Sequence, residues 1–167
     1  MYLLCVTATK PIGFYELDFK SWNAANNATT KAGKVAKGIT AAYLKPVLLK
    51  VAKDARKVLG PGPIGFLHDR APAYQAAAKD EHVRAAFAGG VELAAGKAPD
   101  MSHLDAGVCK LMENAVEKEG AQSANEIRAV VQNVWKAKIT PAYCLKISKH
   151  IRKKHARGDC AQGRKFL

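Results

Sequence analysis

The sequence predicts an α/β fold built as a single domain over residues 1–167. Its 167 residues and 49% hydrophobic content are enough for one hydrophobic core and too few for two large ones. Short β-forming runs alternate with segments of helical periodicity, in the order two strands, helix, strand, helix, strand and three helices. No apolar run approaches the roughly 18 to 20 residues of a membrane helix, so we expect no transmembrane segment.

The first elements of the chain are predicted to be a β-hairpin and a long basic loop. Residues 2–9 are rich in β-forming side chains, residues 10–13 (K-P-I-G) have turn chemistry, and residues 14–19 alternate again. Residues 22–38 show no hydrophobic period, which predicts a loop. The cations in and beside this loop have no acid between them and suit phosphate contact or solubility equally; they are Lys20, Lys31, Lys34 and Lys37.

A helix over residues 40–59 is predicted next, with Thr40 as its N-cap. Its apolar residues recur at helical spacing, and Pro46 either kinks the helix or marks its true start. The G-P-G-P run at residues 60–63 ends the helix, and the compact apolar run at residues 64–67 predicts a buried strand.

The remainder of the chain is predicted to be mostly helical. A helix from Pro72 ends before residue 89, a short strand covers residues 91–94, and a loop at residues 99–105 leads into a helix that continues to about residue 119. Ser123 and Glu126 form a capping box for the next helix. Thr140 caps the last helix, which runs to roughly residue 155 within a basic helical tail over residues 140–167.

Positive charge is concentrated at both ends of the chain. The net charge is +13; residues 1–57 hold 10 basic and 3 acidic groups, residues 58–135 hold 7 and 10, and residues 136–167 hold 10 and 1. A fold that brings both ends to one side would present a positive face to a polyanion, with strong and salt-dependent binding. The alternative is a generally basic, well-solvated surface.

The cysteine pattern favours reduced thiols in an intracellular compartment. The four cysteines include no C-x-x-C pair, which argues against a zinc site. The chain is also larger than disulfide scaffolds usually are and has a core of its own.

Two acids precede predicted helices. Asp69 follows a predicted strand, and Asp105 lies near a helix start. Two converging carboxylates are what a pair of Mg²⁺ ions needs for phosphoryl chemistry. Either side chain could instead complement the dipole at a helix N-terminus, and spacing by itself favours that structural role.

At these two acids the sequence resembles the catalytic domain of mariner-like transposases, which are DNA cut-and-paste enzymes. H-D-R-A-P-A-Y at residues 68–74 is similar to the family's D-N-A-P-A-H segment, and P-D-M-S-H-L-D at residues 99–105 to its P-D-L-N-P-hydrophobic-acid segment. The 35 residues between Asp69 and Asp105 are close to the family's spacing. The resemblance implies an RNase H-like mixed sheet flanked by helices, a helical carboxyl-terminal part, and Asp69 and Asp105 as catalytic, metal-binding residues.

The departures from the family pattern predict a truncated and degenerate domain. The family's first catalytic acid lies on a strand that precedes the hairpin, and that strand is missing here. Arg70 stands where the family has Asn, and an arginine beside Asp69 would pair with its carboxylate in competition with Mg²⁺. No helix-turn-helix region precedes the hairpin either.

Three functions remain open from the sequence. The first is a transposase-derived, non-catalytic basic domain that acts as a nucleic-acid-binding or scaffolding subunit of a larger assembly, such as a ribonucleoprotein. The second is a metal-dependent transposase or nuclease fragment that uses Asp69 and Asp105. The third is a protein–protein subunit of an organellar complex whose basic face meets acidic partners or anionic lipid, with Trp22 and Trp135 as partner contacts or as core.

The predicted partners follow from the first function. We expect RNA or DNA, protein subunits, or both, in the nucleus or an organelle, with no cofactor unless the domain is active, when Mg²⁺ would be required. An exposed helix face is the alternative role for the predicted phosphate-binding cations of the tail. The predicted nucleic-acid-binding residues are Lys31, Lys34, Lys37, Lys149, Arg152, Lys153, Lys154 and Arg157.

Overall fold

The computed structural model of the protein describes residues 1–30, 33–68, 71–88, 92–94 and 102–156, with the backbone alone at 66–68, 92–94 and 154–156. The chain divides into two compact units. The first comprises residues 1–3 and 15–97, and the second comprises residues 4–14 and 98–167. The predicted single domain over residues 1–167 stays a prediction, and each unit is described below by itself.

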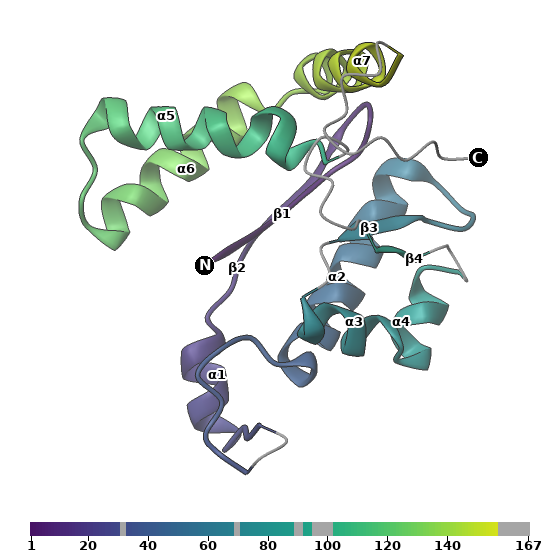
Figure 1. Cartoon of the computed structure of the whole chain (residues 1–167), viewed down its shortest axis with the longest axis vertical. Coiled ribbons are helices and arrows are strands. Elements are labelled where there is room, and N and C mark those ends of the chain that lie inside the picture. Colours follow the sequence, from purple (N-terminus) through teal and green to yellow (C-terminus); the bar gives the residue numbers. More distant parts are fainter. Residues whose placement is uncertain (31–32, 69–70, 89–91, 95–101, 157–167) are drawn as a thin grey trace. The chain divides into compact units, whose positions relative to one another are not determined.

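A β-hairpin opens the chain, as predicted, but its turn comes earlier than expected. Strand β1 (Tyr2–Val6) pairs with strand β2 (Pro11–Glu16), so the predicted turn at residues 10–13 was wrong (Figure 1). The side-chain oxygen of Thr7 accepts hydrogen bonds from the amides of Thr9 and Lys10, and the Thr7 amide donates to the Lys10 carbonyl. A threonine that hydrogen-bonds its own following backbone makes a turn without Gly or Pro.

A short helix stands where a loop was predicted. Helix α1 (Phe19–Ala25) begins at the N-cap Asp18, whose carboxylate accepts from the Ser21 amide. Asn23, on this helix, is buried and donates hydrogen bonds to the carbonyl oxygens of Ala36 and Gly38. The prediction of a loop over residues 22–38 is therefore corrected for its first turn, where contacts with residues more than ten positions away hold the helix.

Helix α2 (Ala41–Leu59) is the central helix of the first unit and confirms the predicted span. Thr40 caps it by accepting a hydrogen bond from the Tyr43 amide, and Pro46 lies inside it without ending it. Gly60 closes the helix at φ 83°, a conformation that favours glycine. The buried face of α2 consists of Tyr43, Leu44, Leu48, Val51, Ala52 and Ala55.

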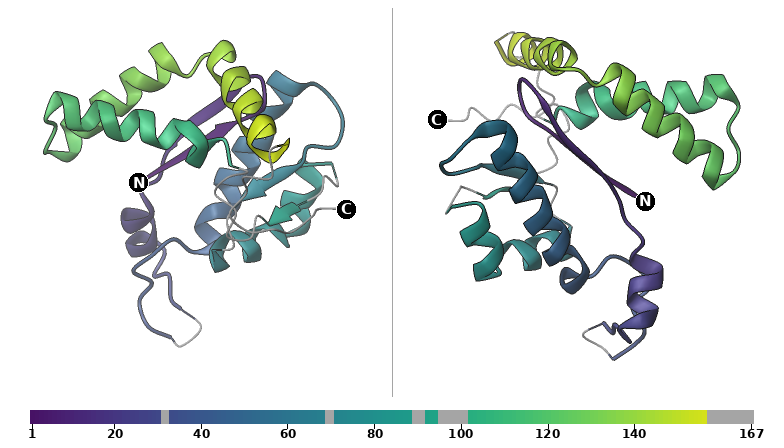
Figure 2. Two further views of the ribbon diagram at one scale, coloured as in Figure 1. Left: turned by 45° about the horizontal axis from the view of Figure 1, so that its top comes forward. Right: turned by 180° about the vertical axis from the view of Figure 1, so that it is seen from behind.

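The predicted helix after Pro72 is two helices. Helix α3 (Pro72–Ala78) and helix α4 (Glu81–Ala86) both pack against α2 (Figure 2). Asp80 separates them because its carboxylate caps α4, accepting from the amides of His82 and Val83, while it also pairs with Lys45 of α2. A long-range ion pair thus fixes a break that the alanine-rich sequence does not indicate.

Two short strands make a parallel pair in the first unit. Strand β3 (Phe66–His68) pairs with strand β4 (Glu92–Ala94) in the register Phe66 to Glu92 and His68 to Ala94. The described strands therefore form two separate two-stranded sheets. The β3–α3–α4–β4 order is a parallel β-crossover of the kind found in α/β folds.

The second unit combines residues 4–14 of the hairpin with a group of helices. A π-helical turn η2 (Leu104–Val108) leads into helix α5 (Cys109–Glu119), which packs against helix α6 (Ala124–Lys138), and helix α7 (Pro141–Ala156) follows. The predicted capping box is present, since Ser123 accepts from the Glu126 amide and Glu126 accepts from the Ser123 amide. Thr140 caps α7 through the Tyr143 amide, as predicted.

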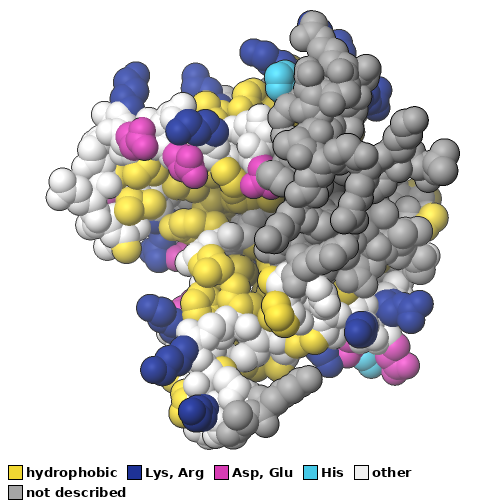
Figure 3. All heavy atoms as spheres, in the orientation of Figure 1, with side chains coloured by type: hydrophobic (Ala, Val, Ile, Leu, Met, Phe, Trp, Pro, Cys, Tyr) yellow, Lys and Arg dark blue, Asp and Glu magenta, His cyan; other side chains and the backbone are white. Residues whose placement is uncertain are grey.

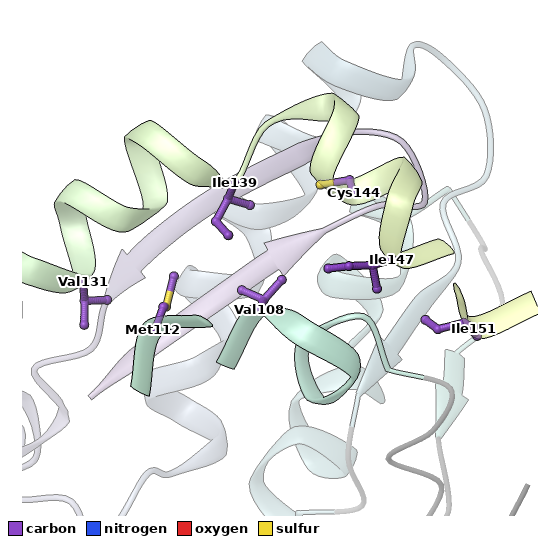
Figure 4. Packing of buried hydrophobic residues seen from close by; sticks show 7 residues of the cluster. All are labelled: Val108, Met112, Val131, Ile139, Cys144, Ile147 and Ile151. Carbon is purple, nitrogen blue, oxygen red and sulfur yellow. The ribbon is translucent and has the colours of Figure 1, made fainter. Parts of the chain in front are cut away.

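These helices and the hairpin share one hydrophobic cluster, shown in Figure 4. Leu4, Val6 and Phe14 of the hairpin pack against it. The cluster brings β1, β2 and all the helices of the second unit onto one core, which sets the face that each helix leaves outside. Its buried members are Val108, Met112, Val131, Ile139, Cys144, Ile147 and Ile151.

Candidate functional site

The two acids predicted to be catalytic belong to different units. Asp69 directly follows strand β3 of the first unit and lies outside the described residues. Asp105 lies in η2 of the second unit, and its side chain is exposed. The prediction that Asp69 and Asp105 act as a pair stays a prediction.

Asp105 stands in an unusual backbone turn. The amide of Val108 donates to the carbonyl of His103, and the amide of Cys109 donates to the carbonyl of Leu104, which are the i to i+5 bonds of a π-helix. Such single π-turns occur frequently at functional sites. The turn gives Asp105 an exposed position at the start of the continuous helix α5.

Close contact with helix α7 holds this turn. A Cβ atom at Gly107 would lie 3.1 Å from the Ile147 Cδ1 atom, so the approach of the two elements requires glycine. The Tyr143 hydroxyl donates a hydrogen bond to the Gly107 carbonyl at 3.3 Å. The segment that carries Asp105 is thereby packed on the inner face of α7.

A second polar contact joins the same elements to the hairpin. The buried Ser148 hydroxyl on α7 lies 2.6 Å from the Ala8 carbonyl oxygen, to which it donates, and 2.7 Å from His103 Nε2. Burial lowers the pKa of His103 below its ordinary value of 6.5, so the ring is neutral at pH 7. With the hydroxyl proton on Ala8, Nε2–H donates to Ser148. Sequence reasoning missed this contact because its members are 45 and 140 residues apart.

The described residues were also tested as a magnesium site. Among them, no three His, Cys, Asp or Glu groups lie close enough to hold a metal ion together. Asp105 is the one predicted ligand within the described part of the chain. The described donor set therefore does not fit a two-metal centre, and we derive no reaction step through one.

Helix α7 carries a continuous stripe of exposed cations. Lys146, Lys149 and Lys153 follow one another at spacings of three and four residues, and Arg152 lies beside them, so all four share one face. The opposite face supplies Cys144, Ile147 and Ile151 to the core cluster. We call the set Lys146, Lys149, Arg152 and Lys153 the α7 stripe.

The charges of the α7 stripe are not compensated within the described part of the chain. None of its four cations forms an ion pair with another described residue, and no Asp or Glu occurs between Glu126 and Asp159. Residues 146–153 span about 10 Å of helix, close to one Debye length at physiological salt, so their potentials add. Figure 3 shows Lys and Arg side chains gathered over this helix.

The structure places the other predicted phosphate contacts as follows. Lys149, Arg152 and Lys153 are together on α7, whereas the side chain of Lys154, and Lys31 and Arg157 entirely, lie outside the described residues. Lys34 and Lys37 are exposed in the first unit, in the loop after α1. Sequence reasoning missed Lys136, Lys138 and Lys146, which are exposed at the end of α6 and on α7; the absence of acids over residues 127–158 was the signal for them.

The lysines of helix α2, by contrast, mostly have structural partners. Lys45 pairs with Asp80 at 2.6 Å, and Lys57 pairs with Asp54 at 2.8 Å. The Lys50 ammonium lies over the Tyr15 ring, 5.6 Å from its centroid. These cations are occupied with the fold of the first unit, which distinguishes them from the α7 stripe.

Both tryptophans serve the core rather than an open surface. Trp22 makes an edge contact with Tyr43 at 5.6 Å between ring centroids, and Trp135 packs against Phe14 at 5.9 Å. The described cysteines, Cys5, Cys109 and Cys144, are free thiols. None of the helices in the described part of the chain has the length and apolarity to span a bilayer.

Comparisons with known proteins agree with this architecture at the level of the fold. No protein-family model matches the chain, and no curated protein matches it. Among solved structures, it is similar to the catalytic domain of the Mos1 mariner transposase, with a TM-score of 0.64 and 16% sequence identity, over 99% of this chain and 76% of that one. The mixed α/β, RNase H-like class expected from the sequence is thereby confirmed.

Proposed function

We propose that this chain is a transposase-derived, non-catalytic domain that binds nucleic acid through exposed cations. We propose further that it does so as a binding or scaffolding subunit of a larger assembly, such as a ribonucleoprotein. The observation that carries the proposal is the α7 stripe, four exposed cations on one helix face with no ion pair among the described residues. The fold likeness to a transposase catalytic domain supports an origin in a DNA-handling framework.

The stripe has the properties that phosphate recognition needs. Lys and Arg bind backbone phosphates without reading sequence, and each phosphate contact releases counterions. Two of its cations, Arg152 and Lys153, also complement the negative end of the α7 dipole, which stabilises the helix itself. That stabilisation needs no more than the last turn, whereas Lys146 and Lys149 lie one to two turns earlier.

A role without catalysis is proposed from the sequence around Asp69. Arg70 adjoins this acid, and the two motifs supply two of the three acids that mariner-like enzymes use. Two carboxylates are too few to hold two metal ions in line with a phosphate.

The likeness to a catalytic domain, together with the π-turn at Asp105, favours a second candidate function, a metal-dependent transposase or nuclease. In that case Asp69 and Asp105 would be ligands for Mg²⁺, which would stabilise charge on a transferring phosphate. Nicking of supercoiled plasmid in Mg²⁺ or Mn²⁺, abolished in Asp105→Ala, would favour this candidate over the first.

The test of the first proposal is a salt titration of binding to a fluorescently labelled nucleic-acid duplex. The full chain should bind with an affinity that falls steeply between about 50 and 200 mM salt. Lys149→Glu with Lys153→Glu should weaken binding by more than tenfold and flatten the salt dependence, because two phosphate contacts become repulsive. Asp105→Asn, exposed in the same unit, is the matched control and should leave affinity unchanged or slightly raise it. Equal losses in the two variants would contradict the proposal.

A further inference from the structure

The loop after α1 is an ordered two-stranded element. The Ala36 amide donates to the Ala28 carbonyl at 2.8 Å, and the Thr30 amide donates to the Lys34 carbonyl at 2.7 Å. Thr29 and Val35 form an antiparallel bridge between these bonds. We call residues 28–37 the basic ribbon. Its backbone geometry is set before any partner arrives, which lowers the entropy cost of binding.

Asn23 anchors the base of the basic ribbon. Its side chain is 3% exposed, and its amide nitrogen donates to the carbonyls of Ala36 at 3.1 Å and Gly38 at 2.8 Å. The Asn23 Oδ1 atom is buried with no partner among the described residues. An unpaired buried acceptor is destabilising, so the two bonds on the other side of the amide must offset that cost.

The anchor determines which side chains of the basic ribbon face outward. Ala36 is 7% exposed and faces the core, so alternation along the strand turns Val35 and Lys37 outward. Val35 is 70% exposed. Lys34, also exposed, follows Gly33, whose φ of 72° makes the tight turn that glycine favours. The tip therefore presents an apolar, β-branched side chain between two lysines.

The surroundings of the ribbon are entirely positive in sequence. No Asp or Glu occurs between Asp18 and Asp54, whereas seven Lys residues do, if Lys20 is included with those of the ribbon and of α2 up to Lys53. Figure 3 shows Lys and Arg side chains along α1 and the loop after it. An acidic partner is thus selected by charge, and a lone exposed valine would otherwise need no explanation.

We propose that the basic ribbon is a second nucleic-acid contact, in which Lys34 and Lys37 bind backbone phosphates and Val35 packs against the intervening sugar. A sugar-phosphate backbone alternates anionic and apolar groups, and the tip alternates cationic and apolar groups in the same way. Two-stranded ribbons are known to enter nucleic-acid grooves. The proposal rests on the proposed function and adds a site in the other unit of the chain.

The test separates charge from apolar contact in the full chain. Lys34→Gln with Lys37→Gln should lower the slope of log affinity against log salt by about 1.8 on a DNA duplex, at about 0.9 per phosphate lost. Lys53→Gln with Lys79→Gln removes two exposed lysines of the same unit and is the matched control, with no change of slope expected. Val35→Ser should weaken binding about fivefold at unchanged slope, whereas Leu59→Ser, an exposed apolar control, should not.

An RNA duplex of the same sequence forms the second arm. Losses in both arms support a contact to the shared backbone, and a loss confined to one arm assigns the contact to that nucleic acid. Wild-type binding that the ribbon variants leave unchanged, or that the control pair weakens equally, overturns the ribbon contact alone. A wild-type chain that binds neither duplex overturns the proposed function itself.

Discussion

Arg56, near the end of helix α2, joins three segments of the first unit through backbone oxygens. Its guanidinium donates from Nε and Nη2 to the Ala86 carbonyl, at 3.2 and 2.9 Å, and from Nη1 to the Gly62 carbonyl at 3.2 Å. Ala86 ends α4, so its carbonyl has no partner within its own helix. The same corner contains the bond from the Ile64 amide to the Phe87 carbonyl, just before strand β3.

We expect Arg56→Met to destabilise this corner by about 2 kcal/mol. A hydrogen bond from a charged donor contributes about 1.5 to 3 kcal/mol, and partial exposure of the site places the sum for the three bonds toward the lower end. Methionine keeps most of the aliphatic packing, so the loss is chiefly polar. Lys57→Met, which removes only the exposed pair with Asp54, should cost about 0.5 kcal/mol and is the neighbouring control.

Hydrogen exchange is the suitable assay because a chain with two compact units need not unfold in one step. In Arg56→Met, the Ile64 amide should exchange about thirtyfold faster, the rate equivalent of about 2 kcal/mol, and about twofold faster in Lys57→Met. Helix α6, in the other unit, should exchange at the wild-type rate in both variants. Indistinguishable rates at Ile64 in the two variants would refute the reasoning that the guanidinium holds this corner.

Two further predictions follow from titratable groups. The hydrogen bond from Lys45 is the main cause that lowers the pKa of Asp80 below its ordinary value of 3.8, so the carboxylate stabilises the fold above that value and the stabilisation is lost as the pH falls through the lowered pKa. Asp80→Asn retains the helix cap, and urea titrations should show a shallower loss of stability below about pH 4 than in the wild type; parallel curves would contradict this. Burial raises the pKa of the Cys5 thiol to about 12, so mass spectrometry should find Cys5 unmodified by iodoacetamide in native protein at about pH 8 and fully modified in urea, whereas rapid native labelling would show that β1 is open.

Local chemistry made part of the fold predictable from the sequence. The helix starts at Thr40, Ser123 and Thr140 were predicted correctly because a capping residue contacts amides only two or three positions away. The glycine stop after α2 is equally local, since Gly60 adopts a positive φ. Features of this kind carry their cause within one turn of the chain.

The elements that the sequence missed depend on distant partners. Helix α1 is stabilised by Asn23 bonds to residues 13 and 15 positions away, and the break between α3 and α4 by the pair of Asp80 with Lys45. In the candidate site, the α7 stripe was predictable because helical spacing is a sequence property. The relation of Asp69 to Asp105 was not, because it depends on how strand β3 and turn η2 are placed, and the spacing between the motifs does not encode that.

The opening hairpin makes the second unit discontinuous in sequence. Its residues 4–14 are synthesised first, yet Leu4, Val6 and Phe14 belong with a core completed only by Ile151. A fragment limited to residues 98–167 would therefore expose the apolar surface those three side chains cover and should aggregate. During synthesis, the same three side chains must wait until α7 has left the ribosome, which makes the newborn amino-terminal hairpin a natural target for chaperones.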